Sequence, residues 1–194
     1  MRTKHVADYA GFTEATMYRL FPTKTILLRD AFLSVDKKIS DILTQSSFIR
    51  NPEKTPFELG VYAVWRKVYR YLIEHSEETL FLIRYRYSSL YTEEVRNMRQ
   101  ANNGGFDRAY AVFEKHYGEN AHSYQGFLIN YIFEMTLAFA EKVITGKIED
   151  SEAAEESVWL AVSSAVDQLT RHQEDSQTDD NHNFNCHRRG LVNA

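Results

Sequence analysis

The sequence lacks the features that mark several large classes of protein. It has a single cysteine, Cys186, so no disulfide can form within the chain, which suits a reducing cytoplasm. No segment offers about 20 uncharged apolar residues, and no apolar signal-peptide core opens the chain, so we expect a cytoplasmic protein without a membrane span. A nucleophile elbow, a phosphate-binding glycine loop, a dinucleotide fingerprint and a Ser/His/Asp set are all missing. The sequence therefore gives no support for an enzyme.

The most informative motif of the sequence lies near the N-terminus, where the pattern predicts two short helices around a tight turn. Val6, Ala7 and Ala10 recur at helical spacing behind Thr3, a suitable N-cap. Gly11 ends this first helix, because glycine adopts the left-handed conformation without steric cost. The second helix has Thr13 as its N-cap, ends at Pro22, and has an apolar face formed by Met17, Leu20 and Phe21. Two helices about a glycine-containing turn are typical of a helix-turn-helix.

Residues 10–24, AGFTEATMYRLFPTK, also resemble the DNA-binding signature of the TetR family of transcriptional regulators. That signature reads Ala-Gly, a hydrophobic residue, Ser/Thr, two variable residues, Thr, a hydrophobic residue, Tyr, two variable residues, and Phe-Pro-x-Lys. The resemblance implies a second helix that enters the major groove of double-stranded operator DNA. The DNA-binding residues it implies are Thr3, Lys4, Thr13, Glu14, Ala15, Thr16, Tyr18, Arg19 and Lys24.

The resemblance also suggests individual roles for these side chains. Thr16 and Tyr18 would donate hydroxyls to phosphates, and Ala15 would touch a thymine methyl. Arg19 would meet a base or a phosphate, and Thr3, Lys4 and Lys24 would meet the backbone. Glu14 departs from the basic or small polar residue often seen there; it would accept from a cytosine amino group or face solvent. The alternative for Tyr18 is packing against Phe21 within the head.

The distribution of charge agrees with a DNA-reading head. Residues 1–38 contain seven Lys/Arg and four Asp/Glu, a balance of +3, whereas residues 39–194 contain sixteen and twenty-three, a balance of −7. The chain as a whole carries −4. Because phosphate binding depends on local basic charge, this asymmetry fits a small head on an acidic body.

In the family, another amphipathic helix precedes the one that begins here near Thr3. We therefore expect an N-terminally incomplete head, in which Val6, Met17 and Phe21 are partly uncovered and which is the least stable part of the molecule. A long helix capped by Thr23 and apolar through about residue 45 would connect this head to the body. We expect three segments: a head with its connecting helix (1–45), a helical ligand-binding and dimerisation domain (46–171), and a disordered tail (172–194).

Helical periodicity continues through the body and predicts an all-α fold. We expect helices over 57–74, 77–91 and 93–100, a loop at 102–105, and a helix from Phe106 to Tyr117. The segments 124–146 and 150–171 are more apolar than one subunit requires. They match the place where TetR-like regulators build the interface of a homodimer, a four-helix bundle from two subunits.

The body is also rich in aromatic residues, as the cavity of a small-molecule sensor would be, although each of them also fits an ordinary core. Glu134 interrupts an apolar run; it could pair with Arg84 or Arg86, receive a cationic ligand, or belong to a solvated stripe with Asn130 and Glu141. We predict that Trp65, Tyr110, Tyr131 and Glu134 face one cavity. The full set of candidate ligand-binding residues is Trp65, Tyr69, Arg84, Tyr87, Tyr110, Phe113, Tyr131 and Glu134.

His182, Cys186 and His187 are a poor zinc site, because they lie in the expected tail without a fourth ligand, so we predict neither a metal nor a cofactor. Together these features predict a TetR-like DNA-binding regulator, a repressor released by a small-molecule effector. The alternative is a helical ligand-binding or dimerising protein whose shortened head does not bind DNA.

Overall fold

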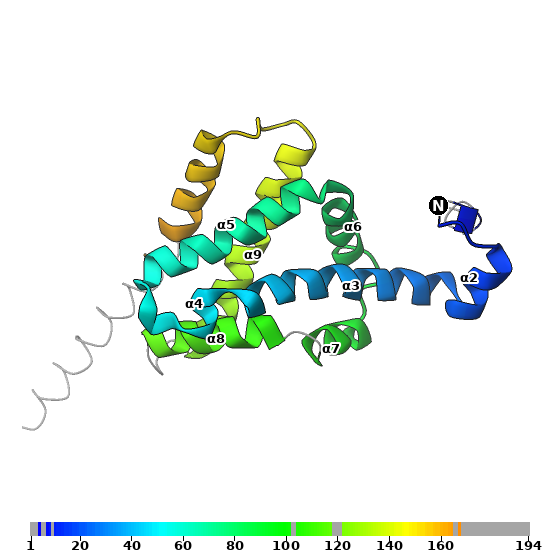
Figure 1. Ribbon diagram of the computed structural model, residues 1–194, viewed down its shortest axis with the longest axis horizontal. Helices are drawn as coiled ribbons and strands as arrows, with labels where there is room; N and C mark the ends of the chain where they lie inside the picture. Colours follow the sequence, from blue (N-terminus) through cyan, green and yellow to red (C-terminus); the bar gives the residue numbers. More distant parts are fainter. Residues whose placement is uncertain are drawn as a thin grey trace, which may run out of the picture. The chain divides into compact units, whose positions relative to one another are not determined.

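A computed structural model describes residues 4, 7–8, 10–101, 104–117, 122–164 and 167, with only the backbone described for 122–127. All regular structure within these residues is helical, which confirms the predicted all-α fold (Figure 1). The chain forms two units, Met1–Ala109 and Tyr110–Ala194. The boundary predicted after residue 45 stays a prediction, and the tail predicted over 172–194 lies outside the described residues.

The first unit consists of consecutive helices of very different lengths. Their bounds are α2 Glu14–Leu20, α3 Lys24–Gln45, α4 Ser47–Arg50, the 3₁₀ turn η1 Pro52–Lys54, α5 Phe57–Glu74, α6 Ser76–Arg86 and α7 Glu93–Ala101. The next helix, α8, spans Gly104–Tyr117 and begins in this unit. The sequence therefore predicted the bounds of α5 correctly and those of α7 to within one residue.

The longest helix of this unit, α3, packs against α5, α6 and α7 (Figure 1). Its N-cap is Thr23, as predicted, and the Thr23 hydroxyl accepts a hydrogen bond from the Ile26 N–H at 3.2 Å. Phe32, Val35, Ile39 and Leu43 repeat every three or four residues and are all buried. Burial of this stripe holds α3 in the unit.

Three stretches of the first unit differ from the sequence prediction. The loop predicted over 102–105 is wrong at Gly104 and Gly105, because α8 begins at Gly104 and not at Phe106. The predicted break after residue 45 contains the short helix α4, because Ser46 caps it and Phe48 and Ile49 bury their side chains. The helix predicted over 77–91 ends at Arg86. There the Ser88 hydroxyl donates to the Tyr85 carbonyl at 2.8 Å and accepts from the Leu90 N–H at 3.2 Å. Such local side-chain bonds offer the backbone an alternative to helix.

Polar contacts tie α3, α5 and α6 together. The Lys38 ammonium lies 2.7 Å from one oxygen of Glu78, and the Tyr71 hydroxyl donates to the other oxygen at 2.8 Å. The hydrogen bond from Lys38 holds the pKa of Glu78 below its ordinary value, although partial burial opposes it. Burial and the bond to Glu78 raise the pKa of Tyr71. One residue later, the buried Thr79 hydroxyl donates to the Leu72 carbonyl at 2.7 Å.

The second unit contains the rest of α8, the helix α9 (His122–Ile144) and a helix over residues 152–164. The described part of α9 buries Leu128, Ile129, Phe133, Leu137 and Ala140. This helix ends at Ile144. Gly146 follows it with a φ of 71°, which allows its own N–H to bond the Val143 carbonyl and the Lys147 N–H to bond the Lys142 carbonyl. That is a Schellman motif, as a glycine after the last helical residue predicts. Over the described residues, no helix has both the length and the apolar content needed to cross a bilayer.

Candidate functional site

The helix-turn-helix begins with helical residues that end in a glycine turn. Ala7 and Asp8 are helical, and Gly11 has a φ of 71°. The Phe12 N–H donates to the Ala7 carbonyl at 2.9 Å, and the Gly11 N–H donates to the Asp8 carbonyl at 3.2 Å. This is a second Schellman motif, and it turns the chain directly into the next N-cap. The predicted role of Gly11 is therefore confirmed.

Thr13 then starts α2. Its hydroxyl oxygen accepts from the Thr16 N–H at 3.1 Å and lies 2.9 Å from the Thr16 hydroxyl. The helix ends where the Phe21 N–H bonds the Met17 carbonyl at 2.8 Å. Capping at one end and Pro22 beyond the other limit α2 to seven residues.

The orientation of α2 divides its side chains into an inner and an outer set. Met17 is only 5 % exposed, and Ala7 of the preceding helix is also buried. Glu14, Ala15, Tyr18 and Arg19 are all exposed, and Thr16 is half-buried. The four outward residues are among those that the sequence predicted to face DNA.

The prediction that Met17 would be uncovered is wrong, because the side chain midway along this short helix takes the inward position. Phe21 is half-buried, and Val6 lies outside the described residues. The exposed apolar surface of the head belongs instead to Phe12 and Leu20, at 52 % and 56 %. Sequence periodicity had assigned Leu20 to the inner face.

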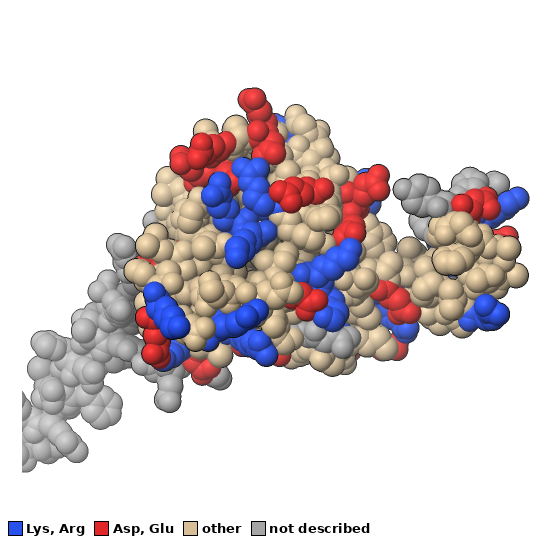
Figure 2. Space-filling view, viewed as in Figure 1, with Lys and Arg blue, Asp and Glu red and all other residues tan. Residues whose placement is uncertain are grey.

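The remaining head residues lie beside the two helices. Lys24 is the first residue of α3, and both Lys24 and Lys4 are exposed. Thr3 lies outside the described residues. The face of the head in Figure 2 displays both Lys/Arg and Asp/Glu, so its charge is mixed rather than uniformly basic. Asp8 and Glu14 are exposed acidic residues of the head.

An aromatic cluster fixes α3 to the end of α6. Phe32 stacks on Tyr85 with ring centroids 4.6 Å apart, and Tyr91 meets Phe32 edge-on at 5.4 Å. The guanidinium of Arg96 lies 5.8 Å from the centroid of the Tyr91 ring. Burial raises the pKa of Tyr85, whose hydroxyl donates to the Leu90 carbonyl at 3.2 Å. The helix that follows the head is thus in contact with the turn between α6 and α7.

Of the candidate ligand-binding residues, four belong to the first unit. Trp65 and Tyr69 lie on the buried side of α5 and stack at 5.2 Å with an interplanar angle of 10°. Arg84 is exposed on α6, and Tyr87, just beyond it, is 77 % exposed. The structure therefore brings Trp65 and Tyr69 together, while Arg84 and Tyr87 present their side chains to solvent.

The other four candidates belong to the second unit. Phe113 on α8 is buried, and Tyr110 on the same helix is half-buried. Tyr131 and Glu134 on α9 are also half-buried, between the exposed Asn130 and Glu141. The shared cavity predicted for Trp65, Tyr110, Tyr131 and Glu134 stays a prediction.

Sequence reasoning missed a row of buried polar groups on α3. Asp36 is buried against Arg99 of α7, with Oδ1 and Nε 2.8 Å apart, and Ser40 is buried one turn later. The Ser40 hydroxyl accepts from the Gly105 N–H at 3.0 Å. The available signal was the four-residue spacing of Asp36, Ser40 and Thr44, each next to an apolar residue of the buried row, Val35, Ile39 or Leu43.

The arrangement of helices was compared with those of solved structures. The chain is similar to a TetR family transcription regulator from Marinobacter aquaeolei VT8, with a TM-score of 0.66 over 84 % of this chain and 82 % of that one. The chain has the TetR fold. Sequence identity across the match is 16 %, so the likeness concerns the fold. No protein-family model and no curated protein matches the sequence.

The described part of this TetR fold contains no group of three or more His, Cys, Asp and Glu residues placed to hold a metal ion. His182, Cys186 and His187 lie outside the described residues.

Proposed function

We propose that this chain is a TetR-like DNA-binding transcriptional regulator, a repressor that a small-molecule effector releases from its operator, and not an enzyme. The observation that carries the proposal is α2: a capped helix after a glycine turn, with Glu14, Ala15, Tyr18 and Arg19 all exposed. The TetR fold supports it, because the similar solved protein is described as a transcription regulator. A cytoplasmic location follows from this role.

DNA recognition would divide between base edges and phosphates. Ala15 and Arg19, both exposed on α2, would reach base edges, and Glu14 would accept from a cytosine amino group. Tyr18 is exposed and would donate its hydroxyl to a phosphate, as would the Thr13 and Thr16 hydroxyls, which lie 2.9 Å apart. Thr3, Lys4 and Lys24 would contact the backbone on either side.

A homodimer would present two such helices to one operator. The helix over 152–164 buries Val158 and Val162 on one side, whereas Leu160 is 66 % exposed and Ala161 is also exposed. Because TetR-like regulators build their dimer interface at this end of the chain, Leu160 would be buried against a second copy. The two recognition helices would then enter major grooves one turn apart, about 34–36 Å.

Effector binding would act through α3. In the first unit, three residues separate this helix from α2, and it packs on α5, α6 and α7. The candidate effector contacts are Trp65, Tyr69, Arg84 and Tyr87 in the first unit and Tyr110, Phe113, Tyr131 and Glu134 in the second, and effector binding would favour one arrangement of the helices within each unit. Movement of α3 would change the separation of the two heads, and a small change suffices to lose DNA.

The second candidate function is a ligand-binding or dimerising protein whose head does not bind DNA. The exposure of Phe12 and Leu20 and the mixed charge of the head favour it. Large apolar side chains exposed beside the recognition helix are unusual on a surface that meets a polar backbone.

The test is selection of double-stranded DNA from a random pool by the full chain. We expect enrichment of a palindrome and binding that weakens steeply with salt. Arg19→Ala should then raise Kd by roughly 5- to 150-fold, corresponding to about 1–3 kcal/mol for one base contact. Arg108→Ala is the matched control, because it removes the same charge from an exposed position on α8.

Failure to enrich any sequence, with the chain folded and dimeric, would support the second candidate. Equal weakening by Arg19→Ala and Arg108→Ala would contradict the assigned role of α2. A thermal-shift screen of lipophilic cations, acyl-thioesters and aromatic acids would then identify effectors, whose addition should release the selected DNA.

A further inference from the structure

The helix α3 contacts the other helices of the first unit through two different kinds of surface. Towards one side it buries the apolar row Phe32, Val35, Ile39 and Leu43. Its other buried residues, Asp36 and Ser40, are polar and meet α7 and the first turn of α8. Close packing of apolar side chains tolerates small adjustments, whereas a buried charge is stable only with its partner in place.

Asp36 and Arg99 form the stronger of the two polar contacts. Their side chains are 4 % and 15 % exposed, and Oδ1 lies 2.8 Å from Nε. Burial lowers the pKa of Arg99, but the charge of Asp36 and its hydrogen bond outweigh this effect and raise the pKa. The Arg99 guanidinium also lies 5.3 Å from the centroid of the Phe106 ring, so the ion pair reaches from α3 across α7 to α8. Moving α3 away from α7 would leave a buried carboxylate without its cation.

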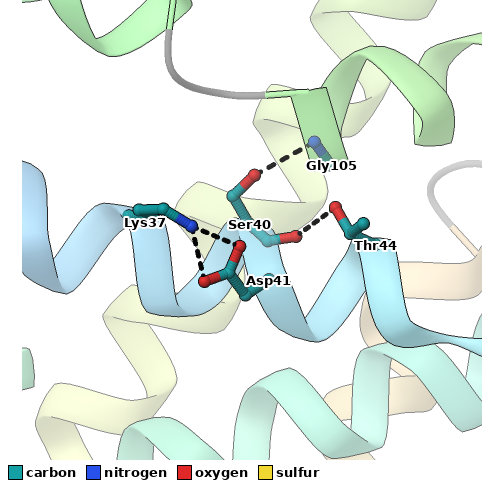
Figure 3. A network of polar contacts seen from close by, with 5 residues as sticks. All are labelled: Lys37, Ser40, Asp41, Thr44 and Gly105. Carbon is teal, nitrogen blue, oxygen red and sulfur yellow. Dashed lines mark hydrogen bonds and ion pairs between the residues drawn. The ribbon is translucent and has the colours of Figure 1, made fainter.

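Ser40 and Gly105 form the second contact, one helical turn further along α3 (Figure 3). The hydroxyl of Ser40 points to the Gly105 N–H, while the Ser40 carbonyl accepts from the Thr44 hydroxyl at 3.0 Å. A Cβ at position 105 would overlap the Ser40 carbonyl, so the backbones of α3 and α8 are in direct contact there. Only glycine permits this approach.

We propose that Asp36–Arg99 and Ser40–Gly105 act together as a latch that fixes the position of α3, and so of α2, relative to α7 and the start of α8. The two contacts are directional and one turn apart, so both are made in a single register of α3. Opening the latch leaves the apolar row packed on α5 and α6 and lets α3 take more than one position. The latch thus limits the range of positions that the head takes relative to α7 and the start of α8. Its consequence for operator binding rests on the proposed function.

The experiment compares two Asp→Asn substitutions on the same helix. Asp36→Asn removes the charge that holds Arg99. Asp41→Asn removes an exposed carboxylate whose two oxygens lie 2.7 Å from the Lys37 ammonium (Figure 3). Spin labels at Ala15→Cys on α2 and Asn97→Cys on α7, both exposed positions, report their separation in the full chain. The background is Cys186→Ser, and excess unlabelled protein isolates the distance within one subunit.

We expect one narrow distance distribution for the parent and for Asp41→Asn, and a broadened or split distribution for Asp36→Asn. Gly105→Ala should broaden it too, although it removes no charge, because the added methyl forces α8 away from α3. A narrow, unchanged distribution in folded Asp36→Asn would overturn the latch, as would equal broadening in Asp41→Asn. If circular dichroism shows that Asp36→Asn does not fold, Ser40→Ala takes its place, with the same two outcomes.

A purely structural role would lower the melting temperature of Asp36→Asn without changing the distance distribution of the folded protein. On a selected operator, we expect Asp36→Asn to weaken binding by roughly 2- to 30-fold and Asp41→Asn to leave it unchanged. If no operator is found, the proposed function fails while the distance measurement still decides the latch.

Discussion

The hydroxyl of Thr79 offers a sharp test of how α5 and α6 are joined. Thr79 is fully buried, and its hydroxyl donates to the carbonyl of Leu72, which is also fully buried, at 2.7 Å. Leu72 lies in the last turn of α5, whose carbonyls have no partner within their own helix. Thr79→Val keeps the shape of the side chain and removes the donor. The Leu72 carbonyl would then lose this partner in a place that water does not reach.

Leaving a buried carbonyl without its donor costs about 1–3 kcal/mol. A domain is stable by only about 5–15 kcal/mol, and each kcal/mol shifts the melting temperature of a chain of this size by about 2–4 °C. We therefore expect Thr79→Val to lower the melting temperature by about 2–12 °C. Urea unfolding followed by circular dichroism should show a lower midpoint with an unchanged slope.

Thr145→Val is the matched control. The Thr145 hydroxyl donates to the Glu141 carbonyl at 2.7 Å in the same way, but at an exposed position where water can replace it. We expect its effect to stay within about 0.5 kcal/mol. If Thr79→Val were as stable as the parent, or if both variants lost equal stability, the reasoning about the buried carbonyl would be refuted.

Two further predictions concern glycine conformation and a titrating carboxylate. Gly146→Ala should lower the free energy of unfolding by about 1–2 kcal/mol, because φ is 71° at this position. Gly104→Ala should raise it by about 0.4–1 kcal/mol, because an added Cβ there meets nothing within 4 Å. Urea midpoints of the two variants that shift in the same direction would contradict this reasoning. Glu78→Gln should lower stability near neutral pH, because Lys38 holds the folded pKa of Glu78 below its unfolded value. The stability contributed by ionised Glu78 is present above its unfolded pKa and is lost as pH falls through its folded pKa. The urea midpoints of variant and parent should therefore converge in acid. A difference in midpoint that persists in acid would exclude the ion pair as its cause.

The sequence predicted those parts of the fold that depend on local chemistry. Thr13 and Thr23 cap their helices, and Gly11 adopts the left-handed conformation, because these roles follow from residue type and neighbours alone. The end of α6 was missed because Ser88 competes for the backbone there. Burial of Met17 and exposure of Leu20 depend on how the short helix α2 rests on its neighbour, which periodicity over seven residues does not determine.

The candidate DNA-binding site stays a prediction, and the contacts that position it were not predicted. Glu14, Ala15, Tyr18 and Arg19 were identified by resemblance, and the structure exposes all four. Asp36 and Arg99 are 63 residues apart in the sequence, and the sequence around either residue does not predict that the two will pair. A buried ion pair between distant helices follows only from the tertiary arrangement.

That separation has a consequence for the protein as it is being made. Until the ribosome has released Arg99 and Gly105, Asp36 cannot form its ion pair with Arg99 and Ser40 cannot accept from the Gly105 N–H, so this side of α3 is more stable in water than buried. The apolar row of α3 can therefore pack on α5 and α6 as soon as these helices have emerged, but its polar side cannot dock on α7 and α8 until more than half of the chain has been made. During translation the register of α3 would stay unfixed until this late stage, and a chain interrupted before Arg99 would contain α3 without either latch contact, a partly folded species that chaperones and proteases recognise.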